Sequence, residues 1–547
     1  MSSDSQSEMT SRRWAALAVY AVVTLLSFPH EMPGGFALDL GLLCVWFGPA
    51  ALIVGIDGLA PRRAARVAFA ASLAGHVVLF HWFYVVTVLY GGMPAWLGVL
   101  APLVPSLYVS IFTALFAWTW ARFIRDSVSP VWVGAMTWVA IDWLRGHLMG
   151  GFPWATLGYA LHLDWPLLGW TRWAGVYVLS FLAAAVGIAI AAAWRERTQQ
   201  SRHSLAIVLG IVVIAHGLGF WIGSGEFESP VKVRIAAVQG NIDQGQKWDA
   251  ELRDRILGTY LRLSERAADE GAEWIVWPET AVPGVIEADR VMRDQIGRLA
   301  RDRRATLVVG GTGVDIDPIA RRYTAFYDSA FLYDDAGVVR DRYDKTHLVP
   351  FGEFVPLRGL FGRFFKALAS GLSSTDVTAG ARVRPIEIGW GKTAESPLLV
   401  GVPICYELLF PHTVGEFGRE GAGVLLAITN DAWYGRTGAP HQFLAMTSMR
   451  AAENGRWVVR AANTGISAII DARGRVHESS PLFEEAVVVA EVPVSTRETP
   501  TLYARIGDVF AWSCIAASLG FYVRKRLEEA RDRSGEQGFG SERDRSA

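Results

Sequence analysis

The chain has 547 residues, of which 51% are hydrophobic and 19% are charged, and its formal net charge is −1. Only 21 of the 105 Lys, Arg, Asp and Glu residues lie within residues 1–223, where Lys is absent and 15 of the 22 Trp are found. Trp-rich, charge-poor sequence is typical of helices anchored at lipid headgroups. The composition excludes a purely soluble protein. The near-zero net charge, without a basic tract, argues against nucleic acid as a partner.

Apolar runs long enough to cross a hydrocarbon layer of ~30 Å predict seven transmembrane helices within residues 1–223 and one more at 503–523. The first run could alternatively be a signal peptide that is cleaved. The small residues around Pro33 lack the A-x-A pattern of a cleavage site, so we expect the helix to be retained. The seven N-terminal runs cover 14–29, 36–57, 66–88, 94–121, 130–149, 174–194 and 204–223.

Basic residues between these runs predict the orientation, because Arg and Lys are retained on the cytoplasmic side. Every second loop is basic, and seven helices then place residues 224–502 outside the cytoplasm. The helix at 503–523 returns the charged residues 524–547 to the inside, and we expect a disordered tail at 527–547. The basic residues on the cytoplasmic side are Arg12, Arg13, Arg62, Arg63, Arg66, Arg122, Arg125, Arg195, Arg197, Arg202, Arg524, Lys525 and Arg526.

Residues 224–502 have the pattern of a layered α/β domain. Segments 248–269, 288–303 and 442–453 have the apolar spacing of helices that pack on a sheet. Strand-like runs alternate with them at 231–238, 273–277, 306–311, 323–333, 397–405, 423–429, 456–470 and 486–492.

Three predicted strands are followed by reactive side chains: Glu279 in WPET, Lys345 in DKTHLVPFGE and Cys405 in ICYE. Sites in α/β sheets assemble at strand ends. A carboxylate can take a proton from a thiol, a thiolate can attack an acyl carbon, and an ammonium group can stabilise the oxyanion. Each residue alone has an ordinary alternative, namely a helix cap, a turn residue and an inert core thiol. Together they suffice for acyl transfer through a thioester.

Cysteine and histidine usage argues against disulfides and metal binding. The chain has three cysteines, and Cys405 is the single one in the polar domain, since Cys44 and Cys514 fall in apolar runs. This leaves no internal disulfide and no zinc knuckle, and the eleven His residues are scattered without an HxxxH pair. We expect no metal and no cofactor.

Glu279, Lys345 and Cys405 resemble the Glu-Lys-Cys triad of the nitrilase superfamily. The wider sequence is similar to the apolipoprotein N-acyltransferase family over nearly the whole chain, through the strings KTHLVPFGEFVP, ICYE, TNDAWYG, HQFLAMTSMRAAENGR and RAANTGISAIID. The resemblance implies a nitrilase-like αββα sandwich inserted between the seven N-terminal and the one C-terminal transmembrane helices. It also implies a multi-pass protein of the bacterial cytoplasmic (inner) membrane, with its catalytic domain on the periplasmic face.

The resemblance further implies the roles of six polar-domain residues. Glu279 would be the general base, Lys345 the oxyanion stabiliser and Cys405 the nucleophile. Glu353 would be a second essential acid, Glu407 would orient the lysine segment, and the backbone N–H of Tyr406 would complete the oxyanion hole.

Three further residues match substrate-binding positions of the family. Trp248 and Trp433 would line a lipid-facing mouth, with core packing as the alternative, and Arg145 would lie near the substrate, with a headgroup anchor as the alternative. One residue departs from the family pattern, because Asp328 stands where Asn is expected. An added carboxylate would raise the pKa of neighbouring acids if both stayed ionised.

The reaction that the resemblance implies is a two-step acyl exchange, and we expect the protein to be a monomer. A phospholipid would donate its acyl chain to Cys405, and the α-amine of a diacylglyceryl apolipoprotein would accept it. A membrane-bound nitrilase-type amidohydrolase and an inactive scaffold are the alternatives. Residues 357–372 carry an apolar face and three cations, which predicts a lid that dips into the headgroup layer, with a core helix as the alternative.

Overall fold

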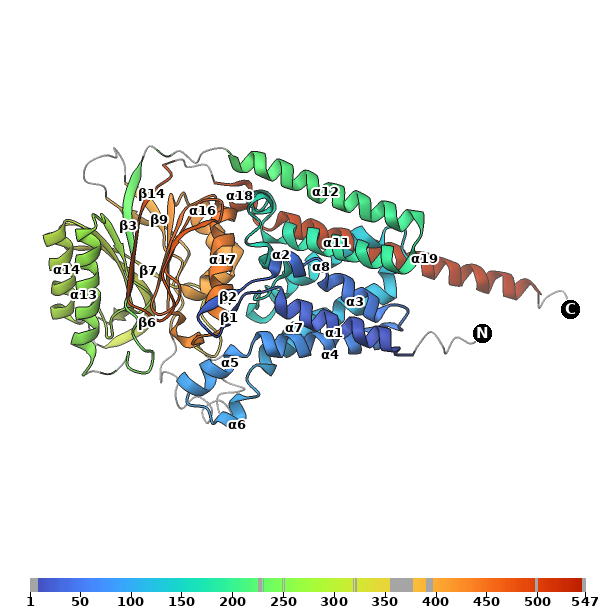
Figure 1. Cartoon of the computed structure of the whole chain (residues 1–547), viewed down its shortest axis with the longest axis horizontal. Helices are drawn as coiled ribbons and strands as arrows, with labels where there is room; N and C mark the ends of the chain where they lie inside the picture. Colours follow the sequence, from blue (N-terminus) through green and yellow to red (C-terminus); the bar gives the residue numbers. More distant parts are fainter. Residues whose placement is uncertain are drawn as a thin grey trace.

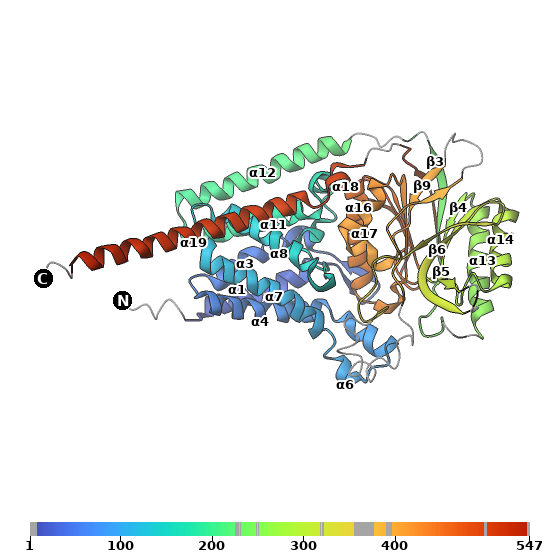
Figure 2. The same cartoon turned by 180° about the vertical axis from the view of Figure 1, so that it is seen from behind.

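The computed structural model describes residues 8–224, 231–247, 251–317, 322–354, 377–389, 397–496 and 500–543, together with residues 229, 249 and 319. Along its longest axis the molecule has a helical half and an α/β half (Figure 1). The helical half contains most of the first 224 residues and the C-terminal helix, so the α/β half is inserted between helices that lie side by side (Figure 2).

The long helices of the helical half run roughly along the long axis of the molecule (Figures 1 and 2). They are α1 (Ser11–Leu26), α4 (Pro61–Leu79), α7 (Leu103–Thr119), α8 (Pro130–Arg145), α11 (Val176–Glu196), α12 (Gln199–Ser224) and α19 (Val509–Arg543). Shorter elements connect them: β1 (His30–Met32), β2 (Phe36–Leu38), α2 (Gly41–Cys44), α3 (Gly48–Ile56), α5 (Trp82–Tyr84), η1 (Val85–Tyr90), α6 (Ala95–Gly98), η2 (Trp120–Ile124), η3 (Leu148–Gly150), η4 (Leu157–Leu161), α9 (Trp165–Leu168) and α10 (Thr171–Ala174).

Three helices in the described part of the chain are long and apolar enough to cross a membrane: Ala95–Ile124, Val176–Glu196 and Gln199–Ile222. A fourth is added if Pro61–Leu79 and Trp82–Tyr90, which are bent by 56° relative to each other, form one span. Helices α1 and α8 have 16 residues each, which at 1.5 Å per residue is about 24 Å and shorter than the ~30 Å hydrocarbon layer. The chain is therefore a membrane protein with three or four candidate spans, and the count of seven stays a prediction.

The C-terminal segment differs from its prediction. Helix α19 continues to Arg543, so the expectation of a disordered tail from residue 527 is wrong for most of that segment. Two contacts hold this part of α19 against the helical half. Both terminal nitrogens of Arg122 donate to Glu529, each at 2.6 Å, and Lys525 donates to the carbonyl of Phe123 at 2.8 Å.

The α/β half contains two six-stranded sheets, in the orders β14-β3-β4-β5-β6-β7 and β13-β12-β11-β10-β9-β8. In each sheet three neighbouring strands are parallel, β3-β4-β5 and β9-β10-β11, and the outer strands pair antiparallel. The first sheet is formed by β3 (Lys232–Gln239), β4 (Trp274–Val276), β5 (Thr306–Ile316), β6 (Tyr323–Tyr333), β7 (Val339–Asp344) and β14 (Ala486–Pro493). The second is formed by β8 (Ile386–Ile388), β9 (Leu398–Gly401), β10 (Val424–Thr429), β11 (Val458–Ala462), β12 (Ala468–Ile470) and β13 (Val476–Ser479).

The sheets pack face to face, and helices cover both outer faces (Figure 1). Strand β3 shows the alternation that this requires: Ile235 and Ala237 join the core between the sheets, while Ala236 and Val238 join the core under the outer helices. The outer helices are α13 (Arg253–Asp269) and α14 (Arg290–Arg303) on the first sheet, and α16 (Pro411–Arg419) and α17 (Ala439–Asn454) on the second. The αββα sandwich expected from the resemblance is confirmed.

Helix α17 lies between the second sheet and the helical half, which explains why it is buried on nearly all sides. Its polar residues bond to the helical half. Gln442 accepts from the Trp154 indole at 2.7 Å, and Glu453 accepts from the backbone N–H of Val176 at 2.8 Å. The two halves therefore meet through a polar helix face. The remaining elements are η5 (Cys405–Leu409), η6 (Asp431–Tyr434) and α18 (Leu502–Ile506).

Candidate active site

The structure brings together the three residues expected to carry the chemistry. Glu279 lies shortly after β4, Lys345 directly follows β7, and Cys405 begins helix η5 after β9. The Lys345 ammonium contacts the Glu279 carboxylate at 2.9 Å. The Cys405 thiol lies close enough for the charges of both residues to act on its pKa. Two residues from the first sheet and one from the second therefore share one site.

The backbone at Cys405 is held in an uncommon conformation. Its φ is +47°, in the left-handed region that residues other than glycine rarely adopt. Such strain is concentrated at functional sites, where the surrounding structure holds it. The turn ends the strand segment and starts η5, so the backbone N–H of Tyr406 lies at the first turn of a short helix, one residue after the thiol.

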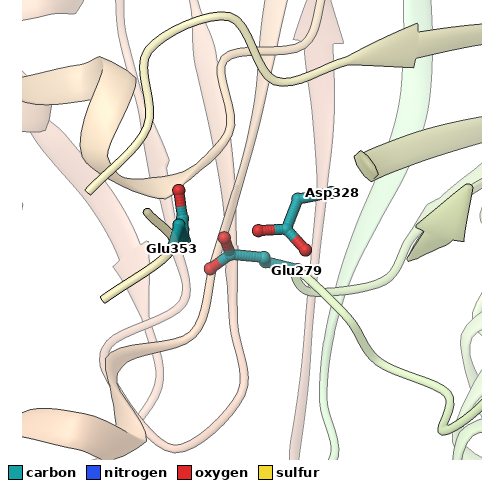
Figure 3. A group of neighbouring side chains, drawn as sticks. All are labelled: Glu279, Asp328 and Glu353. Carbon is teal, nitrogen blue, oxygen red and sulfur yellow. The ribbon is translucent and has the colours of Figure 1, made fainter. Parts of the chain in front are cut away.

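The Lys345 ammonium is fully buried and lies among three carboxyl groups. The distances from its Nζ are 2.9 Å to Glu279, 2.5 Å to Glu353 and 4.0 Å to Asp328. Figure 3 shows the three acidic side chains converging from separate segments, and one oxygen of each lies within 4.8 Å of the others. This spacing would also suit a metal ion, and the lysine ammonium supplies the positive charge at the same place.

Burial and the nearby carboxylates determine the protonation states. Burial and the charge of Glu279 raise the pKa of the Cys405 thiol well above its usual range, against the opposing effect of Lys345. Burial lowers the pKa of Lys345, but Glu279 and Glu353 outweigh it and raise that pKa well above the usual range. At neutral pH the thiol is therefore protonated and the lysine charged, so forming a thiolate requires a base at the site.

Glu279 is held from both sheets. One carboxylate oxygen bonds to Lys345, and the other accepts from the backbone N–H of Asn430, which follows β10, at 3.1 Å. The Asn430 side chain continues the network, because it donates to Gln244 at 2.7 Å. The sequence analysis did not single out Asn430, since a backbone donor leaves no signal in residue type.

Glu407 links the lysine segment to the cysteine segment. One of its oxygens accepts from the Tyr343 hydroxyl at 2.8 Å and from the backbone N–H of Thr346 at 2.7 Å. The other accepts from the backbone N–H of Ile404 at 2.8 Å. Its carboxylate is completely buried, and two of these donors, Thr346 and Ile404, are the direct sequence neighbours of Lys345 and Cys405.

A second buried lysine, Lys247, was missed by the sequence analysis. Its Nζ donates to the backbone carbonyl of Glu279 at 3.2 Å and to the Thr280 hydroxyl at 2.6 Å. Burial lowers the pKa of Lys247 to about 8. Thr280 has a φ of +43°, so Lys247 braces the turn that carries Glu279. A single lysine in a loop has no periodicity that could have revealed this contact.

Two of the three predicted aromatic site residues, Tyr406 and Trp433, lie in the described part of the chain. Tyr406 points to the helical half, where its hydroxyl lies 3.5 Å from the carbonyl of Gly151. Trp433 is half-buried in η6, and its ring meets Tyr90 of η1 edge-on at 5.8 Å. Trp248 lies outside the described residues, as does the segment 357–372 for which a lid was predicted.

Arg145 is buried inside the helical half, so the headgroup-anchor alternative is wrong. Its guanidinium donates to the carbonyl of Trp154 at 2.7 Å and to the Thr156 hydroxyl at 3.0 Å, and pairs with Asp142 at 3.3 Å. It lines a cavity of about 60 Å³ in that half. Substrate binding by Arg145 stays a prediction.

A two-sheet sandwich with Glu, Lys and Cys at its strand ends defines the carbon-nitrogen hydrolase class, and residues 234–501 match the carbon-nitrogen hydrolase family. Residues 13–189 match the N-terminal domain of apolipoprotein N-acyltransferases. Among solved structures, an amidase from Nesterenkonia sp. is 19% identical, with a TM-score of 0.36 over 51% of this chain and 94% of that chain.

Relatives are similar over nearly the full chain. An apolipoprotein N-acyltransferase from Geobacter metallireducens is 36% identical over 93% of this chain and 94% of its own length. Those from Azotobacter vinelandii and Pseudomonas syringae pv. tomato are 33% and 32% identical, over 94% and 86% of this chain and 95% and 92% of their own lengths. The chain belongs to the apolipoprotein N-acyltransferase family and is an acyltransferase.

Proposed function

We propose that the protein moves a fatty acyl chain from a phospholipid to the α-amine of the lipid-modified N-terminal cysteine of an apolipoprotein, through a thioester on Cys405. In the first step Glu279 takes the thiol proton, the sulfur attacks the ester carbonyl, and the ester C–O bond breaks as Glu279 returns the proton to the departing hydroxyl of the lysophospholipid. In the second step the amine attacks the thioester, Glu279 takes the amine proton, and the C–S bond breaks as Glu279 passes that proton to the sulfur, which regenerates the thiol. An amide is more stable than an ester or thioester, so the second step drives the exchange.

The observation that carries this proposal is the position of Glu279. Its carboxylate is fixed between the Lys345 ammonium and the Asn430 N–H, beside a buried thiol whose pKa is raised. A buried, protonated thiol needs an adjacent base, and the lysine then stabilises the thiolate and the oxyanion of the tetrahedral intermediate. The Tyr406 backbone N–H, one residue beyond the sulfur, is our candidate for the second oxyanion donor.

The contact between the two halves supports a lipid donor. Trp82 of the helical half packs on Trp154 at 4.8 Å and on Tyr434 of η6 at 5.0 Å. Tyr434 lies near enough to Cys405 for the two groups to affect each other's ionisation. An apolar wall thus runs from the helical half to the thiol. A water-exposed site would have to extract an acyl chain from the bilayer at about 0.8 kcal/mol per CH₂.

We further propose that residues 1–223 form the membrane domain, 224–502 the catalytic domain, 503–523 the last transmembrane helix, and 524–547 a cytoplasmic segment. In this arrangement the catalytic domain faces the periplasm of a bacterial inner membrane, and the protein acts as a monomer. The alternation of basic loops supports this orientation.

Cysteine labelling in intact cells tests the orientation. In a background without the three native cysteines, Ser224→Cys should react with a membrane-impermeant thiol reagent and Ser534→Cys should not. The reverse pattern would overturn the assignment. Labelling does not require activity, so loss of Cys405 does not affect the result.

Product analysis tests the function. Purified protein with a phospholipid and a diacylated lipopeptide should yield N-acylated lipopeptide and lysophospholipid in equal amounts. Glu279→Gln should abolish both products, whereas Glu416→Gln, a half-buried residue on α16, should leave both unchanged. Release of free fatty acid without N-acylation would instead favour the amidohydrolase alternative.

A further inference from the structure

Asp328 adds a third carboxyl group beside Lys345 and is fixed there by the backbone. It lies on β6, and its carbonyl accepts from the backbone N–H of Lys345 at 2.8 Å. Its side chain is mostly buried and lies 4.0 Å from the Lys345 ammonium, which is beyond hydrogen-bond distance. Glu279 and Glu353 take the close contacts with that ammonium, at 2.9 and 2.5 Å.

The two lysines beside the three carboxyl groups form their hydrogen bonds with groups other than the Asp328 side chain. Lys345 bonds to Glu279 and Glu353, while Lys247 bonds to the Glu279 carbonyl and to Thr280. One carboxyl oxygen of each of Glu279, Asp328 and Glu353 lies within 4.8 Å of the others. Two ionised carboxylates that face each other at such a distance in a buried site repel strongly.

We propose that Asp328 and Glu353 share one proton, so that the Asp328 hydroxyl donates to Glu353 and holds the Glu353 carboxylate against Lys345. The inference rests on the proposed function of the triad. It makes Asp328 a positioning residue that acts through Glu353, because Asp328 itself lies outside hydrogen-bond distance of the lysine. An amide at this position would donate the same hydrogen bond without a titratable proton.

The electrostatics of the cluster agree with the shared proton. Burial and the charge of Glu353 raise the pKa of Asp328 well above its usual range, against the effect of Lys345, and burial also raises the pKa of Glu353. With one shared proton, the Asp328–Glu353 pair carries one negative charge. The positive charges of Lys247 and Lys345 then balance the charge of the pair and the charge of Glu279. Transfer of the Cys405 proton to Glu279 leaves the net charge of the site unchanged.

The shared proton has a consequence at high pH. As the pair loses its proton, a further negative charge appears 4.0 Å from Lys345. That charge weakens the stabilisation of the thiolate and of the oxyanion by the lysine, so thioester formation slows. Lys247, whose burial lowers its pKa to about 8, titrates in the same range, and the charge of Asp328 opposes that lowering. Loss of the Asp328 charge would therefore make Lys247 lose its charge at lower pH, which would slow the variant, so a faster Asp328 variant at alkaline pH reports on the pair.

The test compares wild type, Asp328→Asn and Asp315→Asn from about pH 6 to about pH 10. Asp315 is the matched control, because it lies on the neighbouring strand β5, is largely exposed and bonds to Tyr327 and Arg342. Two rates are measured: S-acylation of Cys405 by phospholipid, and alkylation of Cys405 by iodoacetamide, followed by peptide mass spectrometry. Alkylation needs no acyl donor, so it tests the proton pair even if the proposed acyl transfer fails.

For both reactions we expect the ratio of the rate at the alkaline end to the rate at neutral pH to be about threefold to tenfold higher in Asp328→Asn than in the wild type, as expected for the loss of one charge at a partly screened distance. Asp315→Asn should follow the wild type throughout. Identical profiles for Asp328→Asn and wild type would overturn the shared proton, and so would a loss of alkylation in Asp328→Asn at every pH.

A second measurement covers the case in which Asp328→Asn does not fold. The wild type with isotope-labelled aspartate should show an infrared band of a protonated carboxyl group at neutral pH that disappears on alkaline titration. A spectrum in which no labelled carboxyl group titrates in this range would overturn the proposal.

Discussion

The two sheets have the same arrangement of parallel central strands, yet they contribute different chemistry. The first sheet carries the charged groups Glu279, Lys345 and Asp328, and the second carries Cys405 and the Asn430 N–H. The ionisation of the thiol is therefore controlled by charges on the opposite sheet. The site depends on the alignment of the two sheets as much as on any one of its residues.

Substitutions in the second sheet and then in the first test this difference. The largest effect is expected from Cys405→Ser in the second sheet. A serine hydroxyl has a much higher pKa than a thiol, so Glu279 cannot generate the attacking anion, and we expect N-acylation to fall by on the order of a thousandfold or more. Folding should be intact, because the volume change is small. The matched control is Cys44→Ser, a thiol of the helical half, and N-acylation retained in Cys405→Ser would contradict the thiol mechanism.

Lys345→Met in the first sheet should affect both stability and activity. It leaves three buried carboxyl groups without their ammonium partner, and breaking a buried ion pair costs about 3–5 kcal/mol. S-acylation should fall by about a hundredfold or more, since the oxyanion loses its stabilising charge. Thermal unfolding and acylation assays check both effects. Lys232→Met is the control, because its pair with Glu491 is exposed and contributes about 0–1 kcal/mol. Equal stability of the two variants would contradict the account.

Glu407→Gln weakens the link between the sheets. An amide cannot accept from the donors on both sides, so either the Tyr343 and Thr346 group or the Ile404 N–H loses its acceptor. A buried donor without a partner costs about 1–3 kcal/mol. We expect kcat to fall by about tenfold to a hundredfold with little change in KM, because the substrate contacts remain. A change confined to KM would show that Glu407 acts on binding instead.

The smallest expected effect is a pH dependence of stability at the edge of the site. Burial, with a contribution from His412, lowers the pKa of His347 from 6.5 to about 4, and Lys345 and His147 act in the same direction. Between these values the unfolded chain binds a proton that the folded chain does not, so stability falls as the pH drops from about 6.5 to about 4. Allowing for partial exposure, we expect a loss of about 2 kcal/mol.

His347→Phe should remove this part of the acid sensitivity, since it keeps a ring against Phe410, where the centroids are 3.7 Å apart. Chemical denaturation at several pH values measures the difference from the wild type. The exposed His477→Phe is the control. An unchanged slope in His347→Phe would mean that His347 is charged in the folded protein.

The sheet framework could largely be predicted from the sequence, because buried strands are apolar and easily recognised. Strand β6 begins and ends at the predicted residues, and β10 and β14 differ by one residue at one end. Strands β7, β8 and β13 were missed. β7 reads VRDRYD and β13 is exposed along its whole length, so neither has a hydrophobic pattern, and β8 has three residues. Edge strands of this kind are recognised by their pairing with a neighbouring strand and not by a hydrophobic pattern of their own.

The site was predicted as far as residue type and motif allow. Glu279, Lys345 and Cys405 were found because they end strands and match a family pattern. Lys247 and Asn430 were not, because one is a lone lysine in a loop and the other acts through its backbone. The tail of α19 was assigned to disorder because its composition is charged, whereas a contact with Arg122, far away in the sequence, holds it.

The most direct test of the account is the mass of the enzyme itself during a single turnover. Purified protein incubated with a defined phospholipid should gain the mass of one acyl chain, located on the peptide that contains Cys405. Addition of a diacylated lipopeptide should discharge that mass and produce one equivalent of N-acylated product, and Glu279→Gln should never acquire it. N-acylation at the wild-type rate without an acyl group on Cys405, or an adduct that the lipopeptide cannot discharge, would contradict the thioester mechanism.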